Sequence, residues 1–144
     1  MKRIANVQIT DPFTCEAFTI QSATDREVIP VAEGGDGVMM RPTLVPLTTL
    51  RGVRSFLNAY ARFPGVEVSL EDSSKAMTIF GSLRKADIGG WNYIEFSDDH
   101  YEWLLSIFKV QGTKLFGINT AAVLDAFRLC YLDPATLEVA EAQA

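Results

Sequence analysis

The stretch WNYIEFSDDHYEWLLSIFKVQG, residues 91–112, predicts a strand that runs directly into a helix. Residues 91–96 are mostly aromatic or β-branched, and their side chains alternate between the two faces of a strand. Ser97 stands where a helix N-cap belongs, and two aspartates follow it at the positive end of the helix. Phe96 and Tyr101 occupy the two positions of a hydrophobic staple. All of these signals concern structure, and none of them points to a particular chemistry.

The length and composition indicate a globular domain. The chain has 144 residues, of which 48% are hydrophobic and 22% are charged. A chain of this size buries enough surface to fold without a metal or a disulfide. We expect one domain over residues 1–134 and a C-terminal tail or frayed helix over 135–144. The formal net charge of −5 disfavours nucleic acid as a partner, because sequence-independent binding needs a basic surface.

The cysteines and the apolar runs bear on the cellular compartment. Cys15 and Cys130 are the two cysteines, and they lack the spacing of a metal site or of a redox motif. Free thiols in a reducing compartment are therefore the expectation. No apolar run has membrane-spanning length. We expect a cytoplasmic protein with no membrane contact.

Periodicity along the rest of the chain predicts both strands and helices. Helical spacing predicts helices near 48–62, 98–110 and 119–132, the last capped by Asn119. Alternating residues predict strands at 3–10, 13–21, 26–31, 66–70 and 75–82, of which the last two would form a hairpin. The expected fold class is α+β: an antiparallel sheet of four to six strands with about three helices packed on one face.

The glycine-rich segment at 33–37 has two interpretations. Three glycines in four residues are typical of a flexible surface loop. A phosphate-cradling loop is the alternative, but the Lys-Ser/Thr pair and the GxGxxG spacing are absent. The flexible loop is therefore favoured.

The titratable residues offer one alternative function. His100 is the sole histidine, and it lies in the first turn of a predicted helix, where a surface role is the ordinary one. Glu95, Asp98, Asp99 and Glu102 are the best carboxylates for an acidic-site metal-binding protein or hydrolase. Capping of the helix already explains their positions, so no metal, no other cofactor and no catalytic residue is expected.

A basic stripe offers a second alternative. Arg51, Arg54 and Arg62 recur at helical spacing on the predicted helix 48–62. The stripe would suit a nucleic-acid-associated protein or an acidic partner. The solvated face of an amphipathic helix is the simpler interpretation.

Large side chains at the border of predicted elements suggest a contact surface. Trp103 lies on the flank of its helix, a common place for an interface anchor. Met39 and Met40 would supply adaptable contacts beside it. Together with the three arginines of the basic stripe, these residues are the candidates for binding.

The segment IEFSDDHYEWL, residues 94–104, followed by a helix over 119–127, resembles the closing segment of many small bacteriophage-encoded proteins. There a strand ends in a hydroxyl residue and two acids and enters a short helix, and another helix follows. The resemblance implies an accessory protein that acts by binding. The leading prediction is a non-enzymatic protein-binding accessory protein, either a phage assembly factor or an inhibitor of a host protein, with another protein or a second copy as its partner.

Overall fold

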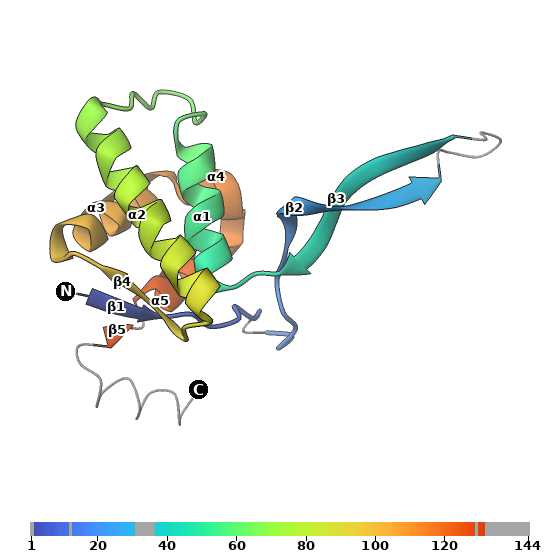
Figure 1. Ribbon diagram of the computed structural model, residues 1–144, viewed down its shortest axis with the longest axis horizontal. Helices are drawn as coiled ribbons and strands as arrows, with labels where there is room; N and C mark the ends of the chain where they lie inside the picture. Colours follow the sequence, from blue (N-terminus) through green and yellow to red (C-terminus); the bar gives the residue numbers. More distant parts are fainter. Residues whose placement is uncertain (1, 12, 31–36, 129, 132–144) are drawn as a thin grey trace.

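The computed structural model describes residues 2–11, 13–30, 37–128 and 130–131. Figure 1 shows helices gathered around a small sheet, from which a long two-stranded ribbon extends to one side. In chain order the elements are β1 (Lys2–Ala5), β2 (Thr19–Pro30), β3 (Val38–Pro46), α1 (Thr49–Tyr60), α2 (Leu70–Gly89), β4 (Tyr93–Phe96), α3 (Asp98–Gln111), α4 (Thr113–Phe116), the 3-10 helix η1 (Gly117–Asn119), α5 (Thr120–Phe127) and β5 (Cys130–Tyr131). We call β2 and β3 together the arm, and the other elements the body. The expected tail at 135–144 and residues 33–36 of the glycine-rich loop lie outside the described residues.

The sheet of the body has three strands in the order β4-β1-β5, and both pairings are antiparallel. On its inner face Ile4 lies opposite Ile94, and both side chains are fully buried. On its outer face Arg3 lies opposite Glu95, and the two are joined by an ion pair of 2.7 Å. The alternation of apolar and charged residues therefore decides which face meets the core.

The predicted single sheet of four to six strands with helices on one face is wrong. In the described part of the chain, the strands divide between the three-stranded sheet of the body and the two-stranded arm. The arrangement is still a mixture of helices and strands. The difference arises because the segment expected to supply two adjacent strands forms a helix.

That segment is α2, and the hairpin predicted at 66–70 and 75–82 is wrong. Ser69 caps the helix, because its hydroxyl accepts a hydrogen bond from the Asp72 amide at 3.1 Å. Ile79 and Leu83 bury one face of the helix against the body. The helix ends at Gly90, which adopts the left-handed conformation with φ of 63°. Residues 75–82 alternate well enough to suggest a strand, but the burial of Ile79 and Leu83 on one side of α2 favours the helix.

The predicted strand, cap and helix over 91–112 are confirmed as β4 and α3. The Ser97 hydroxyl accepts from the His100 amide at 3.2 Å. The rings of Phe96 and Tyr101 lie 6.4 Å apart, as a hydrophobic staple requires. The strand begins at Tyr93, two residues later than predicted.

The other two predicted helices differ in accuracy. Helix 48–62 is confirmed as α1, with Thr48 accepting from the Arg51 amide at 3.3 Å. The helix predicted at 119–132 is shorter, because α5 ends at Phe127 and the chain then pairs with β1 as β5. Asn119 makes no capping hydrogen bond with its side chain, since it belongs to η1 instead.

Three phenylalanines form the centre of the core. The ring of Phe108 lies 5.0 Å from that of Phe56 and 4.8 Å from that of Phe127, and all three side chains are fully buried. They come from α3, α1 and α5, so these rings join three helices. The Tyr101 hydroxyl adds a buried bond of 3.1 Å to the Phe127 carbonyl at the end of α5.

Candidate functional site

The arm is a two-stranded antiparallel ribbon that leaves the body. Its pairing runs from Thr19 opposite Pro46 to Pro30 opposite Val38, with an irregularity between Gln21 and Arg26. Within the described residues, no third strand pairs with either β2 or β3. The strands predicted at 13–21 and 26–31 are therefore not separate, because one long strand, β2, begins at Thr19 and runs through both the end of the first and most of the second.

The two edges of the arm differ in their capacity to pair with another strand. The Leu47 amide points toward β2 and donates to the Phe18 carbonyl at 2.7 Å. Counting back along β3 from Pro46, every second residue therefore has its backbone nitrogen on the outer edge of the arm, away from β2. Pro42 and Pro46 both occupy such positions, and proline has no N–H to offer. The β3 edge is therefore partly blocked, whereas β2 contains proline only at its last residue.

One face of β3 exposes apolar side chains. Met40 is 59% exposed and Leu44 is 61% exposed, and their even spacing places them on the same face of the strand. Exposed side chains of this size on one face of a projecting strand are typical of a contact surface. Met39 pairs opposite Ile29 along the same ribbon.

The root of the arm is fastened by a ring of backbone hydrogen bonds. Ile9 donates to the Leu47 carbonyl at 2.8 Å, Phe18 donates to the Ile9 carbonyl at 3.1 Å, and the bond from Leu47 to Phe18 closes the ring. Ile9 and Leu47 are buried in the core of the body. The Arg51 guanidinium adds a bond of 2.8 Å to the Pro46 carbonyl. These contacts hold the base of the arm to the body.

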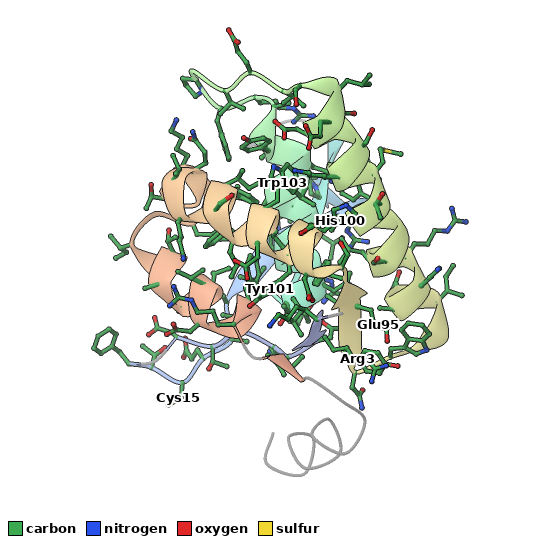
Figure 2. All side chains as sticks on the ribbon, turned by 90° about the vertical axis from the view of Figure 1, so that its left-hand side faces the viewer. Arg3, Cys15, Glu95, His100, Tyr101 and Trp103 are labelled. Carbon is green, nitrogen blue, oxygen red and sulfur yellow. The ribbon has the colours of Figure 1, made fainter. Side chains whose placement is uncertain are left out.

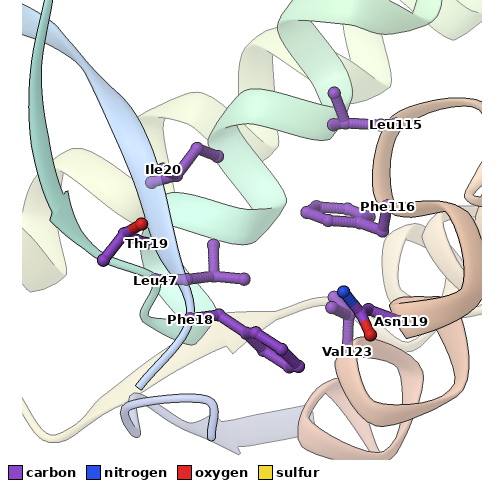
Figure 3. A pocket seen from close by; sticks show the side chains of 8 residues that line it. All are labelled: Phe18, Thr19, Ile20, Leu47, Leu115, Phe116, Asn119 and Val123. Carbon is purple, nitrogen blue, oxygen red and sulfur yellow. The ribbon is translucent and has the colours of Figure 1, made fainter. Parts of the chain in front are cut away.

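A groove lies between the root of the arm and the C-terminal helices (Figure 3). It encloses about 210 Å³. Its walls are mostly apolar, with one amide and one hydroxyl among them: Phe18, Thr19, Ile20, Leu47, Leu115, Phe116, Asn119 and Val123. An apolar cavity of about 150 Å³ is enough for a benzene ring. The groove therefore has room for one large apolar side chain of a partner.

The predicted anchor Trp103 lies in the body, remote from the arm. It is half-buried, its ring meets that of Tyr60 edge-on at 6.3 Å, and the Lys75 ammonium lies 5.9 Å from its centre. Burial, and secondarily the Asp72 carboxylate, raise the pKa of Tyr60. Figure 1 places α3 and the arm on opposite sides of the molecule, so Trp103 and Met40 do not share one surface. The role of Trp103 as an anchor stays a prediction.

The three predicted arginines do not form one groove. Arg51 is engaged with the base of β3, as described above. Arg54 lies near it along a small depression of about 30 Å³. Arg62 follows the end of α1 and is exposed. A continuous basic groove, which nucleic acid would require, is not built from these residues.

The predicted carboxylates also diverge. Glu95 is bound to Arg3, while Asp98, Asp99 and Glu102 are exposed around the start of α3. In the described parts of the chain, no three His, Cys, Asp or Glu side chains gather in a way that would hold a metal ion. The convergent carboxylates that the metal hypothesis requires are therefore not assembled by these four residues.

A second pocket, of about 230 Å³, lies between α2 and the junction of β4 with α3. Its lining consists of Thr78, Ser82, Lys85, Trp91, Glu95, Phe96, Ser97 and His100. The hydroxyls of Thr78 and Ser82 donate to backbone carbonyls of α2, and that of Ser97 accepts from an amide of α3. Figure 2 places Cys15, an exposed free thiol, far from His100. Neither the hydroxyls nor this thiol is thus arranged as an activated nucleophile beside the histidine.

The prediction from sequence missed the residues that form the groove. Phe18 and Ile20 belong to the strand predicted at 13–21, and residues 113–117 lie between two predicted helices. Their apolar character was the available signal. That signal could not show that these residues lie close together in space, because the two walls of the groove are separated by about a hundred positions along the chain.

Two results concern the chain as a whole. Among the helices that the structure describes, none combines the length and the apolar character needed to cross a membrane. No protein-family model, curated protein or solved structure matches the chain.

Proposed function

We propose that this chain is a non-enzymatic protein-binding protein, and that it contacts its partner through the arm and the groove at the root of the arm. The observation that carries the proposal is the isolated two-stranded ribbon, with one edge that retains its donors and exposed Met40 and Leu44. A two-stranded hairpin is marginally stable in water by itself. Addition of a partner's strand would satisfy the free edge and cover apolar surface.

The partner that fits is a protein that offers an extended segment. Such a segment would pair with the β2 edge, since the β3 edge carries Pro42 and Pro46. The start of β2 also forms one wall of the root groove, through Phe18 and Ile20. A strand on this edge therefore leads toward a pocket for a large apolar side chain, which would provide a central hot spot.

The fixed root supports binding as well. The hydrogen-bonded ring through Ile9, Phe18 and Leu47 positions the base of the arm before any partner arrives. Preorganisation of this kind reduces the entropy lost on association. An assembly factor and an inhibitor of a host protein both act through such contacts, and the identity of the captured protein distinguishes the two roles.

The first experiment compares the full chain with a variant whose arm is shortened. Gln21 and Leu44 lie opposite each other, so an Asn-Gly turn can join them and replace the outer arm. Both proteins are used as baits in a lysate of the source organism, and bound proteins are identified by mass spectrometry. We expect the variant to keep the melting temperature of the body and to lose the partner. Equal capture by the two baits would contradict the proposal.

The second experiment tests the edge with the captured protein. In the ladder Gln21 occupies a position whose N–H faces outward, so Gln21→Pro removes a free donor and leaves the internal pairing intact. We expect affinity to fall by about tenfold or more. The matched control is Glu67→Pro, in the irregular segment before α2, which should leave affinity unchanged. A similar loss in both variants would exclude edge pairing as the mode of binding.

A further inference from the structure

The helix α2 carries two stripes with the spacing of helix interfaces, on opposite faces. Steps of four and three residues define an inner stripe and an outer stripe. The inner stripe consists of Asp72, Ala76, Ile79, Leu83 and Ala86. The outer stripe consists of Leu70, Ser74, Met77, Gly81, Arg84 and Ile88. Ile79, Leu83 and Ala86 of the inner stripe are buried against the body, whereas every residue of the outer stripe is exposed.

Three large apolar side chains of the outer stripe are mostly exposed to solvent. Leu70 is 86% exposed, Met77 is 66% exposed and Ile88 is 75% exposed. A helix with apolar residues on both faces is normally covered on both faces. The exposed apolar surface is therefore typical of an interaction site and unlike the free face of an amphipathic helix.

We propose that the outer stripe binds the outer stripe of a second copy of this chain, with the two helices antiparallel. In that arrangement Met77 of one copy faces Gly81 of the other, and Arg84 faces Ser74. Leu70 packs against Ile88 at each end. Met77 and Arg84 thus each meet a short residue, which allows the middle of the two helices to approach closely, and the apolar pair of Leu70 with Ile88 closes each end. Space for the contact exists, because a side chain at Gly81 would meet no atom within 4 Å.

The charges of α2 favour the antiparallel orientation. Glu71 near the start of the helix and Lys85 near its end both flank the outer stripe, on the same side of it. Antiparallel packing places Glu71 of one copy beside Lys85 of the other, which pairs opposite charges. Parallel packing would set Arg84 against Arg84 and leave a gap between the two Gly81 residues. In the antiparallel pair a two-fold axis passes near the middle of the helix, so both copies make the same contacts.

This contact lies on the body and does not depend on the proposed function of the arm. The test is sedimentation equilibrium of the purified full-length protein over a range of concentrations. We expect a monomer–dimer equilibrium, and Met77→Lys should raise the dissociation constant by about tenfold or more, since it places a cation near Arg84 of the other copy. The matched control is Val110→Lys on α3, because Val110 is 70% exposed and the change of charge is the same. The control should dimerise as the wild type does.

Disulfide cross-linking tests the orientation. In a background without native cysteines, in which Cys15→Ser is combined with Cys130→Ser, single variants Met77→Cys and Gly81→Cys are oxidised separately and as a mixture. Antiparallel packing predicts a cross-linked dimer mainly in the mixture, whereas parallel packing predicts that each variant cross-links with itself. A wild type that remains monomeric at about millimolar concentration would overturn the proposal. The proposal would also be overturned if Met77→Cys cross-linked only with itself. An equal rise in the dissociation constant of the dimer for Met77→Lys and Val110→Lys would overturn it too.

Discussion

The body and the arm are stabilised in different ways. In the body, Phe108 lies between Phe56 and Phe127 with no exposed surface. In the arm, two strands share a ladder of backbone hydrogen bonds, and Met40 and Leu44 remain mostly exposed. Burial of apolar surface dominates folding stability, whereas a net backbone hydrogen bond contributes little. We therefore expect the body to determine the stability of the chain and the arm to determine its contacts.

The largest effect is expected for Phe127→Ala in the body. Loss of a fully buried ring that packs on Phe108 removes transfer free energy and leaves a cavity, so we expect a cost of about 3–5 kcal/mol. Leu44→Ala in the arm should change the free energy of unfolding by less than about 0.5 kcal/mol. Urea unfolding monitored by circular dichroism measures both. Similar costs for the two variants would show that the arm is packed as tightly as the body.

A second prediction compares two glycines of the body. At Gly112 a Cβ would lie 2.6 Å from the Phe108 carbonyl oxygen and 3.0 Å from its ring, so Gly112→Ala should cost about 1–3 kcal/mol. At Gly81 a Cβ would meet open space, so Gly81→Ala should stabilise the helix by up to about 1 kcal/mol. Thermal melts at dilute concentration separate the two. Equal tolerance of both alanines would mean that the end of α3 can move away from the core.

The third prediction concerns the cap of α3. Ser97→Ala should destabilise the body by about 1 kcal/mol, because the His100 amide loses its acceptor. Ser97→Asp serves as the control, since its carboxylate can accept the same bond and should retain most of the stability. The urea midpoints of both variants provide the measurement. An unchanged midpoint for Ser97→Ala would show that the cap contributes nothing to the stability of the body.

The last prediction concerns the junction of the two regions, where a small change in global stability is expected. Arg51→Met removes the bond to the Pro46 carbonyl, and we expect a loss of about 0.5 kcal/mol. The same change should accelerate hydrogen exchange in the arm, because local opening at the root becomes easier. Exchange followed by mass spectrometry compares peptides of β2 and β3 with peptides of α1. A uniform increase over the whole chain would mean that Arg51 supports the body and not the arm.

Local signals predicted the segment from β4 through α3 well. Ser97 and the neighbouring acids mark a helix start within four residues, and the staple of Phe96 with Tyr101 needs only sequence neighbours. The same reasoning failed for α2. Residues 75–82 alternate well enough for a strand, and the inner stripe with Ile79 becomes decisive only when the body buries it.

The candidate site depended even more on distant parts of the chain. Pro42 and Pro46 favour an extended backbone on local grounds, but their position on one edge of a ribbon follows from the pairing with β2. The groove joins Phe18 to Phe116, which no periodicity connects. Trp103 was predicted to stand near Met40, yet the two lie on different regions because the arm leaves the body.

The sequence by itself determined the N-caps and approximate ends of α1 and α3 and the apolar face of α1, since these depend on hydrogen bonds and spacing within a few residues. The tertiary structure decided that α2 is a helix with one face buried in the body, that the strands divide between a sheet and an arm, and that a groove lies at the root of the arm. The physical reason is that burial and strand pairing are interactions between residues far apart in the chain, and their free energy exists only once the chain brings those residues together.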